Sequence, residues 1–248
     1  MNNIEIIKAP DSIKPYAIIY KPAGLPSAPL SNTDTENAFS KTAELFPKLL
    51  NVNGKKDIEH GLIHRLDTAT SGLILIASSQ ECYDYLIEEQ QKNKISKFYK
   101  ALCNIDSNRL EGFPDFPFEI SNKKSFDIVS YFRPFGPGRK QVRPVTKDSG
   151  KAALEKIGKP VLYTTTIEIL KSDFVKNIAE VECKITNGYR HKVRCHLAWA
   201  GLPVIDDILY NPSVKNESAE AMKFCATKIE FEYPRGDLYS YDRKYTWT

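Results

Sequence analysis

The sequence is poor in cysteine, in net charge and in long apolar runs, and each shortage excludes a class of protein. Its five cysteines form no Cys-x-x-Cys pair, so neither a disulfide framework nor a zinc knuckle is expected, and the thiols should be reduced and mostly buried. No apolar run approaches the length that crosses a bilayer, and the first residues lack the basic and then apolar order of a signal peptide. We therefore expect a soluble protein of the cytoplasm.

The rest of the composition is that of an ordinary folded chain. Hydrophobic residues make up 42% of the 248 positions, which is enough to form a core in one large domain or two small ones. The net charge is only +4, but basic residues gather in two stretches that contain no acid. These are Arg133, Arg139, Lys140, Arg143 and Lys147, and then Lys184, Arg190, Lys192 and Arg194. They indicate a surface that binds a polyanion, although two solvated basic loops would explain the charges equally well.

Hydrophobic periodicity predicts a mixed α+β fold, a single domain around a large, mainly antiparallel sheet with flanking helices. Helical spacing indicates helices over 35–46, 81–92 and 191–200, the first capped by Asp34 or Thr35. Residues 134–144 are interpreted as an exposed basic loop. Strands are expected over 16–20, 73–77, from 96 onward, 127–132, 162–170, 178–185 and 223–233, the last of these being the final strand.

One stretch places charged groups directly before a buried strand. His64, Arg65 and Asp67 precede the unbroken apolar run 73–77, with turn-forming and hydroxyl residues between them. In an arbitrary sequence such charges would most simply be a solvated ion pair. Here the order H-R-L-D-T-A-T-S-G-L-I-L resembles the signature of the pseudouridine synthases of the RluA type. That resemblance implies that Asp67 is the nucleophile and that Arg65 stacks on bases where the target has left the RNA helix.

Further stretches resemble the same family from about residue 16 to residue 234. The segment Y-K-P-A-G-L-P at 20–26 is similar to the one that opens the catalytic domain, and K-F-Y-K-A-L at 97–102 implies that Tyr99 lies against the target base. The segment T-N-G-Y-R-H-K-V-R-C-H-L at 186–197 implies that Arg194 pairs with the nucleophile. The resemblance thus predicts one catalytic domain over residues 1–248 without an S4-type RNA-binding extension.

The chain departs from the family pattern near Arg194. Asn187, Tyr189, Arg190 and Lys192 stand where Thr, Arg, Thr and Gln are usual, and Asp206 stands where Gly is usual before Asp207. Tyr233 also replaces a His near the end. His191 and Cys195 lie one helical turn apart, but no fourth ligand is evident, so no metal is expected.

The implied reaction explains these residue types. Converting uridine to pseudouridine breaks the bond between C1′ and N1, rotates the uracil and rebuilds the link at C5, so the oxidation state does not change and no cofactor is expected. A carboxylate can attack C1′ or deprotonate C2′, and a neighbouring guanidinium such as that of Arg194 favours its ionised form. The target base must leave its stack, and the expected partner is tRNA or rRNA, bound by a monomer. Candidate RNA-binding residues are His64, Arg65, Arg139, Lys140, Arg143, Arg190 and Lys192.

Two other functions compete with this one. A member that binds RNA without catalysis would fit the altered segment 187–192 and Asp206, although Asp67, Tyr99 and Arg194 are all retained. A carboxylate glycosidase would need two opposed acids, whereas the signature stretch offers one acid with basic neighbours.

Overall fold

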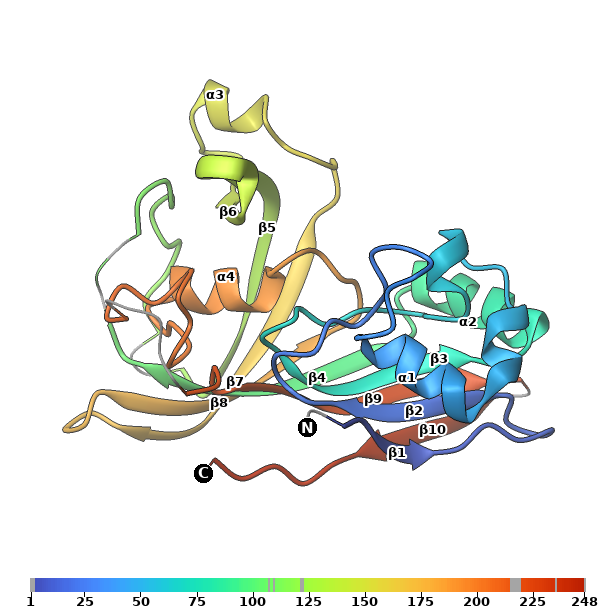
Figure 1. The fold of residues 1–248 in the computed structure, drawn as a ribbon. Coiled ribbons are helices and arrows are strands. Elements are labelled where there is room, and N and C mark those ends of the chain that lie inside the picture. Colours follow the sequence, from blue (N-terminus) through green and yellow to red (C-terminus); the bar gives the residue numbers. More distant parts are fainter. Residues whose placement is uncertain are drawn as a thin grey trace. The chain divides into compact units, whose positions relative to one another are not determined.

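The structure is a computed structural model that describes residues 3–106, 108, 110–120, 123–214, 220–234 and 236–247. It forms two compact units, one of Met1–Lys97 with Cys225–Tyr245 and the other of Phe98–Phe224 with Thr246–Thr248. Each unit combines a sheet with helices, as Figure 1 shows. No helix in the described ranges is long and apolar enough to span a membrane.

The first unit has a buried strand at its centre. Strand β3 (Ser71–Ala77) buries every residue, and it lies in the sheet between β2 and β9. Leu73 and Leu75 pack against Cys82 and Leu86 of the covering helix. The other elements are β1 (Glu5–Lys8), β2 (Tyr16–Lys21), α1 (Ala38–Leu45), η1 (Pro47–Asn51), η2 (Asp57–Glu59), α2 (Gln80–Gln91), β9 (Phe224–Tyr233), whose first residue belongs to the second unit, and β10 (Asp237–Asp242).

Strand pairing in this unit is antiparallel for β1–β2, β2–β3 and β9–β10, and parallel for β3–β9. The parallel pair is short and joins Ser71 and Gly72 to Cys225 and Ala226. Gly72 has φ 134°, and a Cβ there would lie 2.4 Å from the carbonyl oxygen of Ala226. Only glycine fits this close approach, which explains the Gly of the signature stretch.

The second unit has the strand order β4-β8-β7-β5-β6. Helix α4 contacts β6 and β7 (Figure 1). All its residues are buried except Ala198, which is partly exposed. The elements are β4 (Ser96–Asn104), whose first two residues belong to the first unit, β5 (Ser125–Phe135), η3 (Pro137–Arg139), β6 (Gln141–Val145), α3 (Lys151–Leu154), β7 (Tyr163–Asp173), β8 (Ile178–Ile185) and α4 (Lys192–Trp199). The pairs β5–β6, β5–β7 and β7–β8 are antiparallel.

The predicted fold class is confirmed, and three details of it were wrong. The cap of α1 is Asn37, whose side chain accepts the N–H of Ser40 at 2.8 Å, rather than Asp34 or Thr35. Residues 134–144 form the end of the β5–β6 hairpin instead of a loop, and β10 follows the strand expected to be last. Hydrophobic periodicity did not predict strands β6 and β10. Strand β6 contains Pro144, and β10 is polar and largely exposed. The five cysteines are free and buried, as expected.

Candidate active site

Asp67 lies at the turn that leads into β3. The preceding residues run along that strand: the N–H of Ile63 donates to the carbonyl of Leu75 at 3.2 Å, and the N–H of Ala77 donates to the carbonyl of Gly61 at 2.8 Å. A Cβ on Gly61 would lie 2.0 Å from the carbonyl oxygen of Ala77, so the close approach requires glycine. The turn closes where the N–H of Thr70 donates to the carbonyl of Asp67 at 3.0 Å. The half-buried carboxylate thus directly precedes the fully buried strand β3.

A second loop holds the Asp67 turn in place. The fully buried Lys21 ammonium donates to the carbonyls of Pro22 (2.9 Å), Leu25 (2.7 Å) and Thr68 (3.2 Å). Burial lowers the pKa of Lys21 to about 8, and the negative charge of Asp67 opposes that shift. The Lys-Pro-Ala-Gly segment therefore cross-links the backbone beside Asp67.

Ser27 adds to this cross-link. Its hydroxyl donates to the carbonyl of Leu66 at 2.7 Å and accepts the N–H of Leu66 at 3.0 Å. Both backbone groups of the residue before Asp67 are satisfied by one side chain. The Asp67 backbone is therefore fixed from both sides, which restricts the positions that its carboxylate can take.

His64 serves the interior rather than the surface. Its Nε2 accepts the N–H of Leu75 at 3.3 Å, and its Nδ1 is buried without a hydrogen-bond partner in the described chain. Burial, and secondarily the charge of Lys97, hold the pKa of His64 well below its ordinary value. Both ring nitrogens thus face inward, and RNA binding by His64 stays a prediction. Arg65 is exposed, with Nη1 3.0 Å from Glu59 Oε1, as a residue that touches RNA would be.

Lys97 is a buried cation that the sequence did not reveal. It is 4% exposed, and its nearest described acceptor, Gln90 Oε1, lies at 3.5 Å from Nζ. Burial lowers its pKa to about 8. Keeping this ammonium charged and buried at neutral pH therefore lowers the free energy of unfolding.

Lys97→Met should stabilise the protein at neutral pH. The folded pKa of about 8 lies below the ordinary value of 10.5, so between these values the unfolded chain binds more protons and the free energy of unfolding rises with pH. We expect the variant to gain about 1–3 kcal/mol at pH 7 and to lose this advantage towards pH 10.5. Urea unfolding at several pH values measures the difference, and a variant less stable than wild type at pH 7 would contradict it.

Arg194 forms a buried ion pair in the second unit. Its Nε donates to Asp207 Oδ2 and its Nη2 to Asp207 Oδ1, both at 2.7 Å, and the two side chains are 4% and 0% exposed. The ring of Tyr210 lies 5.3 Å from the guanidinium carbon. The structure thus adds Asp207 and Tyr210 to the candidate site residues. In the sequence, only the D-D-I-L-Y segment at 206–210 pointed to them.

Tyr99 is also fixed by its neighbours. It is 7% exposed on β4, and its ring stacks on that of Phe224 with centroids 5.1 Å apart and planes 9° apart. Lys97 and Ala101 share its buried face of the strand, since burial alternates along β4. An aromatic ring held parallel to another ring offers a defined plane for a base.

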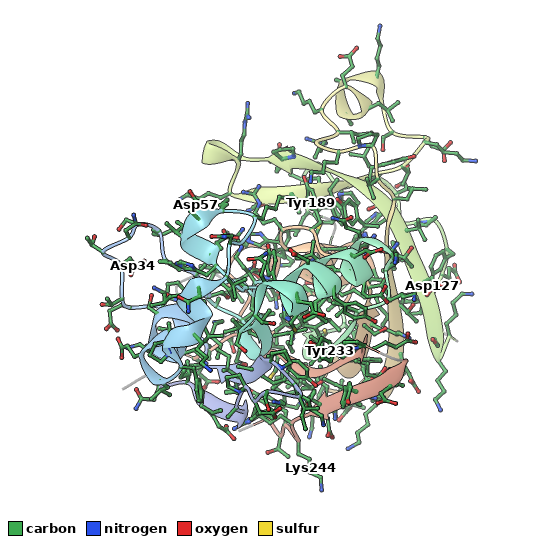
Figure 2. The ribbon with its side chains drawn as sticks, turned by 90° about the vertical axis from the view of Figure 1, so that its right-hand side faces the viewer. Asp34, Asp57, Asp127, Tyr189, Tyr233 and Lys244 are labelled. Atoms are coloured by element: carbon green, nitrogen blue, oxygen red, sulfur yellow. The ribbon has the colours of Figure 1, made fainter. Side chains whose placement is uncertain are left out.

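The altered segment before Arg194 is internally consistent. The buried Lys192 ammonium donates to Asn187 Oδ1 at 3.0 Å and to the carbonyl of Thr164 at 2.8 Å, so two departures from the family pattern bind each other. Tyr189 lies beside β5 (Figure 2), and its ring stacks on Phe132 with centroids 5.0 Å apart. These contacts show that the altered residues are packed and hydrogen-bonded within their unit.

Two further departures also have structural partners. Arg190 Nη2 donates to the carbonyls of Arg139 (2.5 Å) and Gln141 (3.2 Å). These bonds link the segment that precedes α4 to the β5–β6 hairpin. Asp206 has φ 63°, the left-handed conformation that the usual glycine would supply. Aspartate is among the residues that tolerate this region, so the turn before Asp207 is preserved.

The predicted RNA-binding cations divide into exposed and buried ones. Arg139, Lys140 and Arg190 are exposed. Arg143 is 3% exposed, donates to the carbonyls of Glu111 and Val142, and lies over the ring of Phe135 at 4.2 Å. Arg143 and Lys192 are therefore buried and stabilise the interior of their unit, whereas their binding to RNA stays a prediction.

Other polar residues of α4 have interior partners as well. His196 hydrogen-bonds Ser130 Oγ through Nε2 and Thr165 Oγ1 through Nδ1, both at 2.9 Å, and burial keeps its pKa well below the ordinary value. Cys195 Sγ donates to the carbonyl of Val142 at 3.5 Å. His191 hydrogen-bonds the hydroxyl of Tyr210 at 3.2 Å. These contacts give each residue a structural role.

Comparison with known proteins places the chain in a family. The family model for RNA pseudouridylate synthase matches residues 15–199. An uncharacterised RNA pseudouridine synthase of Bacillus subtilis is 26% identical over 221 residues, 89% of this chain and 62% of that protein. The ribosomal large subunit pseudouridine synthase D of Neisseria meningitidis is 24% identical over 210 residues, 84% of this chain and 46% of that protein. The chain thus spans about half to two thirds of the length of these relatives.

A solved structure shows the same fold. The human RNA pseudouridylate synthase domain containing 1 superposes with a TM-score of 0.67 over 98% of this chain and 84% of that one, at 16% identity. The signature stretch with Asp67, the Tyr99 strand and the helix with Arg194 all lie inside the matched range 15–199. This chain belongs to the RNA pseudouridylate synthase family.

Proposed function

We propose that this protein isomerises uridine in RNA to pseudouridine, with Asp67 as the nucleophile, Arg194 as the cation that pairs with it and Tyr99 as the ring against the target base. The observation that carries the proposal is the fixing of the Asp67 turn by Lys21 and Ser27 at the start of the fully buried β3. A surface ion pair would not need two cross-links in its backbone. A nucleophile that must meet one sugar atom does.

The chemistry requires only groups of this kind. The carboxylate attacks C1′ or takes a proton from C2′, the bond to N1 breaks, and uracil carries the negative charge. C5 then bonds to C1′ while the carboxylate leaves C1′ or returns the proton to C2′. C5 loses its hydrogen as a proton and N1 gains a proton, so the product is an isomer and no cofactor takes part in the proposed reaction. Tyr99, held parallel to Phe224, supplies a plane on which the detached uracil can turn.

The proposed substrate is a structured tRNA or rRNA. Exposed Arg139 and Lys140 at the tip of the β5–β6 hairpin, together with Arg65 and Arg190, provide cations for phosphate and base contacts. The Neisseria relative is named for the large ribosomal subunit, and tRNA is the other partner expected from the sequence. Monomeric state and a cytoplasmic location remain predictions from the sequence.

Nucleoside analysis tests the proposed function. The purified chain is incubated with unmodified transcripts of tRNA and rRNA, and the digested RNA is analysed by mass spectrometry for pseudouridine. We expect pseudouridine at a defined position in one transcript. Binding of RNA without any pseudouridine, across all transcripts, would support a non-catalytic RNA-binding protein instead.

Replacing the hairpin cations should weaken RNA binding without stopping the chemistry. Arg139→Gln with Lys140→Gln should raise Kd for RNA about fivefold to tenfold near 0.1 M salt and reduce the slope of log K against log salt by about one to two. Single-turnover rates on saturating RNA should stay within about twofold of wild type. Lys176→Gln removes an exposed cation from the β7–β8 turn and is the matched control. An unchanged salt slope in the double variant would show that the hairpin does not bind phosphate.

A further inference from the structure

The Arg194–Asp207 pair leaves the guanidinium one orientation. A guanidinium has five N–H donors in one plane, and Asp207 takes the donor on Nε and one on Nη2, both at 2.7 Å. The three other donors, two on Nη1 and one on Nη2, point along directions that this bidentate contact fixes. Any other acceptor meets Arg194 through them.

Asp207 is itself held by its surroundings. Its Oδ1 also accepts the backbone N–H groups of Leu209 (3.0 Å) and Tyr210 (3.2 Å), and its own N–H donates to the carbonyl of Val204 at 3.2 Å. The left-handed Asp206 makes the tight turn that allows this. The carboxylate therefore has no rotational freedom to follow a moving arginine.

Tyr210 restrains the guanidinium on its face. Its ring lies 5.3 Å from the Arg194 guanidinium carbon, and its hydroxyl accepts the N–H of Val142 at 2.9 Å. Edge and face of the guanidinium are both in contact with one short segment, 207–210. A buried pair of opposite charges is also nearly neutral as a unit, so what Arg194 offers another group is directed donors more than net charge.

We infer that Asp207 is a positioning residue, which acts on the reaction by fixing the direction of the Arg194 donors. The inference rests on the proposed function, in which Arg194 is the partner of the nucleophile. A positioning role differs from a purely structural one because the effect of Asp207 on the reaction rate then depends on the presence of Arg194. A double-mutant cycle measures that coupling.

The cycle compares wild type, Asp207→Asn, Arg194→Met and the double variant, each assayed below its unfolding midpoint. Asp207→Asn should lower kcat about 30- to 100-fold, because a misdirected group costs that much, with KM for RNA within about twofold. In the Arg194→Met background, Asp207→Asn should lower kcat by less than about threefold. Asp127→Asn removes an exposed carboxylate from β5 (Figure 2) and should leave kcat and the unfolding midpoint unchanged.

Asp207→Glu provides the second variant if Asp207→Asn does not fold. It keeps the charge but moves the carboxylate by one methylene, so kcat should fall although the pair remains charged. A folded Asp207→Asn with kcat within threefold of wild type overturns the inference, as does an equal loss in the Arg194→Met background. Wild-type protein that makes no pseudouridine would instead refute the proposed function, so the two failures are distinct.

Discussion

Asp67→Asn should abolish pseudouridine formation, with a loss of at least about 1,000-fold in the single-turnover rate, and leave Kd for RNA within about twofold. Asparagine has nearly the same shape and still accepts hydrogen bonds, so the cross-links from Lys21 and Ser27 to the neighbouring backbone should persist. What it lacks is the negative charge needed to attack C1′ or to deprotonate C2′. The loss should therefore fall on chemistry alone.

The measurement is pseudouridine per RNA against time, with the enzyme in excess over the transcript identified in the activity screen. Asp57→Asn is the matched control, because Asp57 is an exposed carboxylate of η2 in the same unit (Figure 2). It should react at the wild-type rate. An Asp67→Asn protein that retains more than a tenth of the wild-type rate would show that another residue is the nucleophile.

Arg194→Met should lower the free energy of unfolding by about 3–5 kcal/mol, because it leaves the carboxylate of Asp207 buried without its partner. The two side chains are 4% and 0% exposed, so water cannot replace the lost guanidinium. Turnover should also fall, since the donors proposed to serve the nucleophile are gone. Urea unfolding and single-turnover kinetics measure the two effects separately.

A compensating variant separates stability from catalysis. Arg194→Met combined with Asp207→Leu replaces the ion pair by apolar side chains of similar size, and such replacements are often neutral or stabilising. We expect the double variant to recover most of the lost stability while its turnover stays low. Full recovery of turnover would mean that Arg194 has no part in the reaction.

Local sequence determined most of what identifies this protein. The apolar run 73–77 predicted the buried strand β3, and the polar cluster before it placed Asp67 at the strand's entrance, where the structure has it. Helices α2 and α4 begin and end within one or two residues of the expected bounds. These features follow from local patterns, namely hydrophobic periodicity, helix caps and turn residues, so a single sequence is enough to predict them.

The structure decided what each charged side chain does. Sequence treated Arg143, Lys192 and His64 as surface groups, yet all three have inward partners, and it gave no sign that Lys21 and Lys97 are buried. The identity of a basic residue does not tell whether its cation is solvated or is buried and hydrogen-bonded to backbone carbonyls.

The partner of Arg194 was equally hidden. Asp207 reaches it because a left-handed residue at 206 turns the chain back towards α4, and that geometry arises only when the unit has folded. The sequence by itself therefore determined the family and the position of Asp67, whereas desolvation and hydrogen-bond direction, which depend on atoms distant in the chain, were decided by tertiary structure alone.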